Sequence, residues 1–150
     1  MNTITKSIIL TFLILFMISC QKGEKTIERC NLVTEKNISK SNGKIFTGSC
    51  NIYSNDTILL KTLTYKRGDL RKEVTYYPST NQIEYIGNRR NGIIQGDFKS
   101  FYRNGVMSIE GELDKGRYIG EWNYYDDDGS LNKTLNYDKN GALVETINFK

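Results

Sequence analysis

Apolar and polar residues alternate along most of the chain after residue 47, a pattern typical of half-buried β-strands. One segment illustrates it: Met107, Ile109, Gly111 and Leu113 share one face, and Ser108, Glu110 and Glu112 share the other. Turn signals such as Asp128-Gly129 separate these segments, and no stretch after residue 20 has the period of a helix. The pattern therefore predicts a series of antiparallel β-hairpins.

The hairpins recur with a period of 24 residues from Gly48 to the end of the chain. One aromatic column reads Tyr53, Tyr77, Phe101, Tyr125 and Phe149, and an apolar column reads Cys50, Val74, Phe98 and Trp122. The units are 48–71, 72–95, 96–119 and 120–143, with a partial unit at 144–150. Two turns per unit leave strands of roughly eight residues. This self-similarity predicts an all-β fold, an elongated single-layer antiparallel β-meander of repeated hairpins in which the aromatic column is a structural ladder.

The N-terminus carries an export signal. The apolar run from Ile8 to Ile18 is too short to span a bilayer, and it fits the core of a signal peptide. It ends at Ser19-Cys20, which resembles the bacterial lipoprotein signal. The resemblance implies a signal peptide at 1–19, acyl chains such as palmitate on Cys20, and, from Gln21, the outer membrane. An ordinary signal peptide and an uncut signal anchor are the alternatives.

Two further cysteines, Cys30 and Cys50, remain for a disulfide in an oxidising envelope compartment. Cys50 lies in the apolar column of the first unit, where a stack of repeats has an exposed end. A bond to Cys30 would cap that end, whereas two buried free thiols are the alternative. We therefore expect a tether and N-terminal cap at 20–44 and a repeat domain at 45–150.

Charge is distributed unevenly along the repeats. Residues 48–105 contain nine Lys or Arg and five Asp or Glu, a net charge of +4, and residues 106–150 contain five and nine, a net charge of −4. One end of the sheet is expected to be basic and the other acidic. A solvated surface explains the basic end better than contact with anionic lipid does, and the export signal argues against nucleic acid as a partner.

The residue types argue against catalysis. The chain has no histidine, which removes the commonest general base and most zinc sites. Glu110 and Glu112 share a polar strand face, where a solvated pair is the simplest interpretation. The three carboxylates from Asp126 to Asp128 lack the spacing of a calcium loop, and a hairpin turn accounts for them. We predict a protein that is not an enzyme and that has no cofactor and no metal site.

The last two full units resemble the variant MORN-repeat family (membrane occupation and recognition nexus). Their matching residues are Gly96, Phe98, Phe101 and Gly105 in one unit, and Gly120, Trp122, Tyr125 and Gly129 in the next. The first two units depart from this motif, with Lys72 in place of the opening glycine and with Thr57 and Asn81 in place of the turn glycine. The resemblance implies an elongated sheet of hairpins without a cofactor, and bacterial members are labelled as YwqK-type antitoxins or as membrane-associated proteins.

Together these features predict a lipid-anchored, non-enzymatic binding or scaffolding protein of the bacterial cell envelope. Its expected partners are a membrane, through the N-terminal lipid, and a protein or glycan, through the sheet. The alternative is an antitoxin or immunity protein that occludes a toxin. The sequence leaves the partner and the oligomeric state open.

Overall fold

The computed structural model describes residues 26–27, 29–55, 57–78 and 80–149. The predicted signal peptide at 1–19 and the predicted lipidation site Cys20 lie outside the described residues. In the described part all regular structure is β-strand. The strands are β1 (Thr26–Ile27), β2 (Val33–Glu35), β3 (Ile38–Ser41), β4 (Lys44–Ile45), β5 (Gly48–Ser54), β6 (Ile58–Lys66), β7 (Asp69–Tyr76), β8 (Ile83–Arg90), β9 (Ile93–Phe101), β10 (Met107–Asp114), β11 (Arg117–Tyr125), β12 (Leu131–Tyr137) and β13 (Leu143–Asn148).

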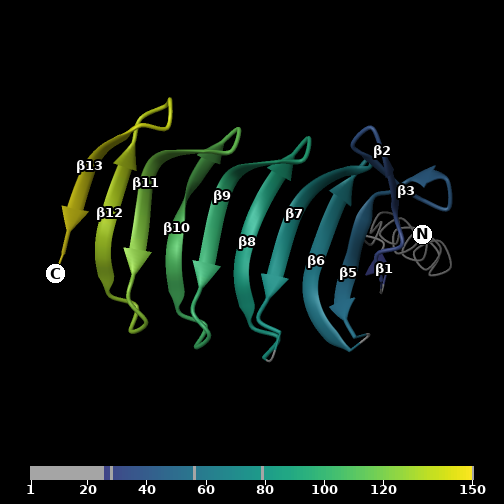
Figure 1. The fold of residues 1–150 in the computed structure, drawn as a ribbon, viewed down its shortest axis with the longest axis horizontal. Helices are drawn as coiled ribbons and strands as arrows, with labels where there is room; N and C mark the ends of the chain where they lie inside the picture. The colour runs from purple at the N-terminus through teal and green to yellow at the C-terminus, as the bar shows by residue number, and fades with distance from the viewer. Residues whose placement is uncertain (1–25, 28, 56, 79, 150) are drawn as a thin grey trace, which may run out of the picture.

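The strands from β5 to β13 lie side by side in sequence order and pair antiparallel throughout. Figure 1 shows this meander as one row that runs from the N-terminal end to the C-terminal end. The prediction of an all-β antiparallel meander is confirmed. Strand β1 adds to β5 in parallel and completes the first edge. Eight strand spacings of about 4.8 Å separate β5 from β13 by roughly 38 Å.

Two kinds of turn connect the strands. On one side of the sheet, two-residue turns occur at Arg67-Gly68, Asn91-Gly92 and Lys115-Gly116, and both residues of each turn have positive φ. Such turns match the twist of antiparallel strands, which explains why glycine stands second. On the other side, the loops at 102–106 and 126–130 are longer, and each closes with a glycine of positive φ. The loop at 126–130 contains Asp128-Gly129, the turn signal named from the sequence.

The core is thin because one sheet cannot bury both of its faces. Among the described residues, the buried apolar side chains are Phe46, Cys50, Leu113 and Trp122. The Trp122 indole lies directly over Gly111, where a Cβ would overlap the ring. The absence of a side chain at Gly111 therefore allows the largest side chain of the protein to be buried on an open sheet.

The N-terminal cap is a second small sheet, β2–β3–β4, that packs against the turn between β6 and β7. Ser39 donates its backbone N–H to the Gly68 carbonyl (2.8 Å), and Gly68 donates to the Phe46 carbonyl (2.6 Å). A Cβ on Gly68 would lie 2.7 Å from Ile38 Cγ2, so only glycine fits this contact. The cap thus fixes one end of the meander and leaves the other end open.

Candidate functional site

One face of the sheet carries a ladder of rings, which we call the aromatic face. Tyr85 stacks on Phe98 at 5.9 Å between centroids, and Phe98 stacks on Trp122 at 5.7 Å. Tyr118 continues the ladder at 4.0 Å from Trp122 and meets Tyr137 edge-on at 5.4 Å. Because these rings come from β8, β9, β11 and β12, the ladder ties together strands that are not direct neighbours. Tyr118 is exposed, so one ring near the C-terminal end of the ladder is accessible.

The same face carries an ion cluster nearer the cap. The buried Glu73 carboxylate accepts hydrogen bonds from Lys61 Nζ (2.6 Å), Tyr85 Oη (2.7 Å) and Arg89 Nε (2.8 Å). Burial alone would raise the pKa of Glu73, but the hydrogen bonds from Lys61 and Tyr85 and the charge of Arg89 outweigh it and hold that pKa below its ordinary value. The hydrogen bond to Glu73 raises the pKa of Lys61. The cluster is a closed, fully paired structural unit.

The strand register shows that Glu73, and not Val74, occupies the second position of the predicted apolar column. The pairs Glu73–Gly87 and Gly87–Phe98 place Glu73 in the row of Phe98 on the aromatic face. Val74 pairs with Ile86 and therefore lies on the opposite face. A strict period of 24 residues points to Val74, so the sequence pattern did not indicate Glu73. Aligning the second unit with a displacement of one residue would place Glu73 in the column.

The aromatic column needs the same correction. At the ends of the outgoing strands, Tyr53 pairs with Leu59, Phe101 with Met107 and Tyr125 with Leu131. In the second unit the corresponding pair is Tyr76 with Ile83, so Tyr76 rather than Tyr77 occupies this position.

The physical reason is a smaller bulge in β7. The register of β7 against β6 shifts by one residue between Leu70 and Lys72, whereas β9 and β11 shift by two residues around Gly96 and Gly120. The loop 77–82, which contains Pro78, is one residue longer than the loop 102–106 and restores the spacing before Gly92. Tyr77 instead opens the loop, and its hydroxyl donates to the Phe101 carbonyl (2.8 Å), as the Tyr102 hydroxyl donates to the Tyr125 carbonyl (2.7 Å). Phe149 follows the end of β13 and is 53 % exposed.

The four predicted repeat glycines all have positive φ, which explains the residue type. Gly105 and Gly129 close the longer loops, where each N–H donates to the carbonyl at the start of its loop (2.9 Å in both). Gly96 and Gly120 lie within strands, at shifts of the pairing register. A glycine of positive φ at such a shift is typical of a β-bulge.

The opposite face, which we call the polar face, is crossed by short hydrogen bonds between neighbouring strands. Thr62 donates to Asn51 Oδ1 (2.9 Å), and Thr134 donates to Asn123 Oδ1 (2.7 Å). Equivalent Thr–Asn pairs thus occur near both ends of the meander. Such pairs stabilise the sheet without burying apolar surface.

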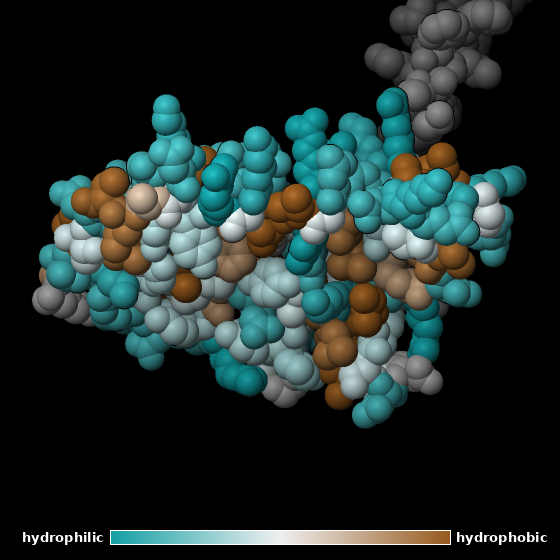
Figure 2. Space-filling model, turned by 45° about the horizontal axis from the view of Figure 1, so that its top comes forward, coloured by the Kyte–Doolittle hydropathy of each residue, from teal (hydrophilic) through white to brown (hydrophobic). Residues whose placement is uncertain are grey.

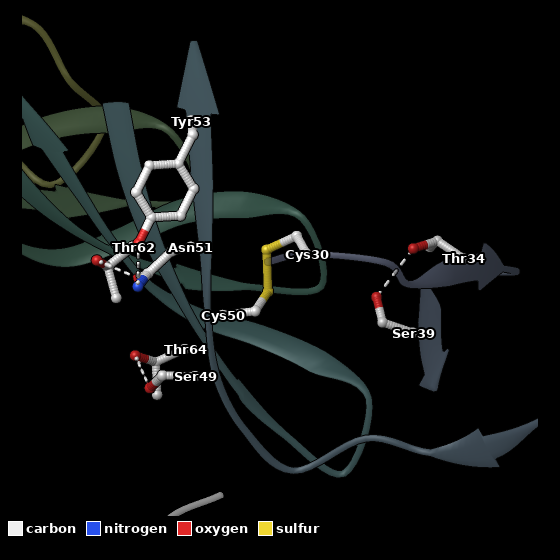
Figure 3. Close-up of a disulfide and its surroundings, with 9 residues drawn as sticks. All are labelled: Cys30, Thr34, Ser39, Ser49, Cys50, Asn51, Tyr53, Thr62 and Thr64. Atoms are coloured by element: carbon white, nitrogen blue, oxygen red, sulfur yellow. Dashed lines mark hydrogen bonds between the residues drawn. A yellow bond between two sulfur atoms is a disulfide. The ribbon is translucent and has the colours of Figure 1, made fainter. Parts of the chain in front are cut away.

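Cys30 and Cys50 form a disulfide, so the predicted pairing is confirmed. Figure 3 shows the bond on the side of β5 opposite Asn51 and Thr62. The backbone N–H of Cys30 also donates to the Asn51 carbonyl (2.8 Å), which continues the pairing of β1 along β5. The disulfide therefore holds the covering segment on the first edge of the sheet.

The carboxylates considered for catalysis are held in structural contacts. Glu110 accepts a hydrogen bond from the Tyr125 hydroxyl (2.7 Å), lies 3.7 Å from Lys99 Nζ and lines a groove of about 410 Å³ with Glu112. That hydrogen bond raises the pKa of Tyr125. Asp126 to Asp128 lie in the loop at 126–130, as the turn interpretation expects. Over the described ranges, no group of three or more Cys, Asp or Glu side chains has an arrangement suited to a metal ion.

The C-terminal edge differs from the rest of the sheet in its exposure. Every residue of β13 is exposed, and its apolar side chains Leu143, Val144 and Ile147 are 53 %, 64 % and 38 % exposed. In Figure 2, hydrophobic side chains are visible at the C-terminal end of the row and also in its middle and toward the capped end, between hydrophilic ones. The two open faces and this edge are the candidate binding surfaces.

No family model, curated protein or solved structure matches this chain. The resemblance to MORN repeats therefore remains a prediction. The part of the chain that the structure describes also has no helix long and apolar enough to cross a membrane.

Proposed function

We propose that this protein is a lipid-anchored, non-enzymatic lipoprotein of the bacterial cell envelope whose repeat sheet binds or scaffolds a protein or glycan partner. The observation that carries the proposal is the open single layer. Nine strands form a row with four buried apolar side chains in the described part, so both faces remain accessible. Such a surface suits recognition, because tyrosine and tryptophan rings combine large contact area with polar edges.

The repeat architecture supports an extended binding surface. We propose that the sheet is built from 24-residue MORN-like hairpin units, with the second unit displaced by one residue. The two-residue turns end at Gly68, Gly92 and Gly116, which lie 24 residues apart. Units that contact only their neighbours give elongated proteins with large surfaces for partners.

The anchor position sets the direction of the sheet. Cys20 precedes Thr26 by six residues, a reach of at most about 20 Å, so a lipid on Cys20 attaches at the capped end. The strands then follow one another away from that end, and the acidic units come last. The proposal thus places the C-terminal edge farthest from the membrane, where a partner meets it first.

Metabolic labelling with palmitate tests the anchor. In the full chain expressed in a bacterial host, Cys20→Ser is expected to abolish the label and to move the protein from the membrane fraction to the soluble fraction. Cys30→Ser is the matched control, because it also removes one cysteine but leaves the acylation site. Label that survives Cys20→Ser would refute the anchor.

Capture from envelope membranes tests the binding surface. The lipidated protein is expected to retain a partner protein or glycan, and Tyr118→Ser is expected to weaken this binding, since Tyr118 is an exposed ring of the ladder. Asn140→Ser, in an exposed loop, is the surface control. Retention of no envelope component would contradict the binding function, and retention of a toxin would favour the immunity alternative.

A further inference from the structure

We propose that β13 is a docking strand, to which a partner protein adds an extended segment that alternates basic and apolar side chains. This inference rests on the proposed binding function and names the class of its partner. It follows from the backbone, the side chains and the charge of the C-terminal edge, and from the contrast with the covered N-terminal edge.

The backbone of β13 has hydrogen-bonding groups on its outer side. Within the described sheet, β13 pairs only with β12. The N–H of Phe149 donates to the Asn132 carbonyl (2.9 Å), so by antiparallel alternation the backbone groups of Thr146 and Asn148 point away from β12. An incoming strand would pair with these outward groups, as in other cases of strand addition.

Apart from the charge of Glu145, the side chains of β13 lack the features that usually protect a sheet edge. The strand reads Leu-Val-Glu-Thr-Ile-Asn, without proline or lysine. Leu143, Val144, Ile147 and the following Phe149 are all exposed. Natural edges are normally blunted by lysine, proline or a covering segment, because an exposed apolar edge attracts other strands.

The first edge of the same sheet, in contrast to β13, is partly covered by another strand. There, β1 pairs with β5, and the disulfide between Cys30 and Cys50 holds the covering segment in place. At the first edge, a segment held by the disulfide thus covers part of β5, whereas no described strand covers β13. Within the described sheet, β13 is the longer unpaired edge that a partner strand could extend.

The negative charge of the C-terminal edge favours a basic partner segment. Residues 106–150 carry a net charge of −4, and Glu145 lies exposed at the centre of β13. Asn136 pairs with both Glu145 and Glu121, which places these two exposed carboxylates in one row of the polar face. A cationic side chain opposite Glu145 would gain attraction from this row.

A second copy of the chain is the weaker occupant. Pairing β13 with itself would bring together two regions that each carry a net charge of −4. A two-fold centred on Glu145 would also place two carboxylates directly opposite each other, which destabilises a strand pair. At the basic end, the segment of β1 and Cys30 already pairs with β5 from Ser49 to Asn51, which leaves less of that edge for another copy.

The geometry defines the expected segment. Glu145 and Ile147 share the polar face two residues apart, whereas the register shift between Asn136 and Tyr137 places Leu143 beside Tyr137 on the other face. The segment should therefore carry a basic side chain with an apolar one two positions away. The test uses the lipidated full chain in detergent micelles with a capped nine-residue peptide, Thr-Thr-Ile-Thr-Lys-Thr-Ile-Thr-Thr. We expect binding, together with slower hydrogen exchange at the amides of Thr146 and Asn148.

Three controls make the outcome specific. A peptide with glutamate in place of lysine should bind at least tenfold more weakly, and Glu145→Lys should reverse this preference. Thr146→Pro should reduce binding at least tenfold, because it removes an outward N–H while leaving the bonds to β12 intact. Circular dichroism checks that both variants keep the fold, and Glu145→Lys remains informative if Thr146→Pro does not.

The results separate this inference from the proposed function. Peptide binding that Thr146→Pro and Glu145→Lys leave unchanged would overturn the docking strand. A dimer of the chain that Thr146→Pro dissociates would also overturn it, since the occupant would then be a second copy. If an envelope partner is retained by both variants, the binding function stands and the docking strand falls. If the peptide binds as expected but no envelope component is captured, the edge chemistry stands and the proposed function fails.

Discussion

The two halves of the meander solve the same packing problem with different chemistry. In the row of the aromatic face, the N-terminal half presents Cys50 and Glu73, and the C-terminal half presents Phe98 and Trp122. The first half is held by a disulfide and by ion pairs around a buried carboxylate. The second half is held by stacked rings over a glycine.

The difference shows how a single-layer sheet compensates for a thin core. Stacked rings bury area on their own neighbours, so a regular pair of units needs no second layer. Near the cap, the disulfide and the charged cluster supply the stabilisation that buried ring area supplies in the other half. The regular half is therefore expected to depend on side-chain shape, and the capped half on a bond and on protonation.

Removing the indole at position 122 should have the largest effect. Trp122→Ala is expected to lower the free energy of unfolding by about 3–5 kcal/mol, because it leaves a cavity over Gly111 and breaks the ladder to Phe98 and Tyr118. Urea denaturation measures the total loss. Trp122→Phe, which keeps a ring, should cost clearly less.

Hydrogen exchange locates this loss. Amides of β10 to β12 should exchange faster in Trp122→Ala, and amides of β5 to β7 should keep most of their protection, because strands that do not touch open separately. Faster exchange of equal size across the whole sheet would show that the two halves are not distinct.

Breaking the disulfide should be the next largest perturbation. Cys30→Ser combined with Cys50→Ser is expected to cost about 3 kcal/mol for the loss of a cross-link over 20 residues. Thermal unfolding of the oxidised and reduced wild type provides an independent measurement. The loss should add to that of Trp122→Ala within about 0.5 kcal/mol, because six strand spacings separate the two sites. Strong non-additivity would mean that the halves unfold as one unit.

The sequence predicted the fold class well because the governing signals are local. Alternation defined the strands, and Gly-containing pairs such as Asp128-Gly129 defined the turns, since positive φ restricts the residue type there. The position of Cys50 in the first unit favoured the disulfide over two free thiols, because that end of a stack needs a cap.

The residues that were placed wrongly depend on register, which is not a local property. The bulge of β7 contains one residue fewer than the bulges at Gly96 and Gly120, so Tyr77 falls outside the column and Glu73 stands where the period expects Val74. A shift of one residue moves a side chain to the other face. The partners of Glu73, from β6 and β8, become apparent only once the strands are paired.

The charged cluster should make the N-terminal half sensitive to acid. The pKa of Glu73 is lowered in the folded protein, so its stabilising contribution is present above the unfolded pKa of about 4.3 and is lost as pH falls through the folded pKa. Glu73→Gln should cost about 2 kcal/mol at pH 7, less than a fully enclosed pair would, because Lys61 and Arg89 retain some contact with water.

Urea denaturation between pH 3 and pH 7 measures this dependence. The wild type should lose stability on acidification, and Glu73→Gln should show a flatter profile over the same range. Glu84→Gln is the matched control, since Glu84 lies on a neighbouring strand outside the cluster. Equal slopes for the wild type and Glu73→Gln would contradict the proposed role of the carboxylate.

The smallest effect should come from the strand glycine that only the regular half retains. Gly120 has a φ of 65°, and a Cβ there would meet no atom within 4 Å, so Gly120→Ala is expected to cost about 1 kcal/mol from backbone strain alone. Asparagine tolerates this conformation better, so Gly120→Asn should cost less than Gly120→Ala.

In the second unit, Lys72 replaces the opening glycine and does not have positive φ, so Lys72→Gly should cost no more than about 0.5–1 kcal/mol, through chain entropy. If Lys72→Gly stabilised the protein, the departure of the first units from the repeat would reflect strain rather than a different local backbone.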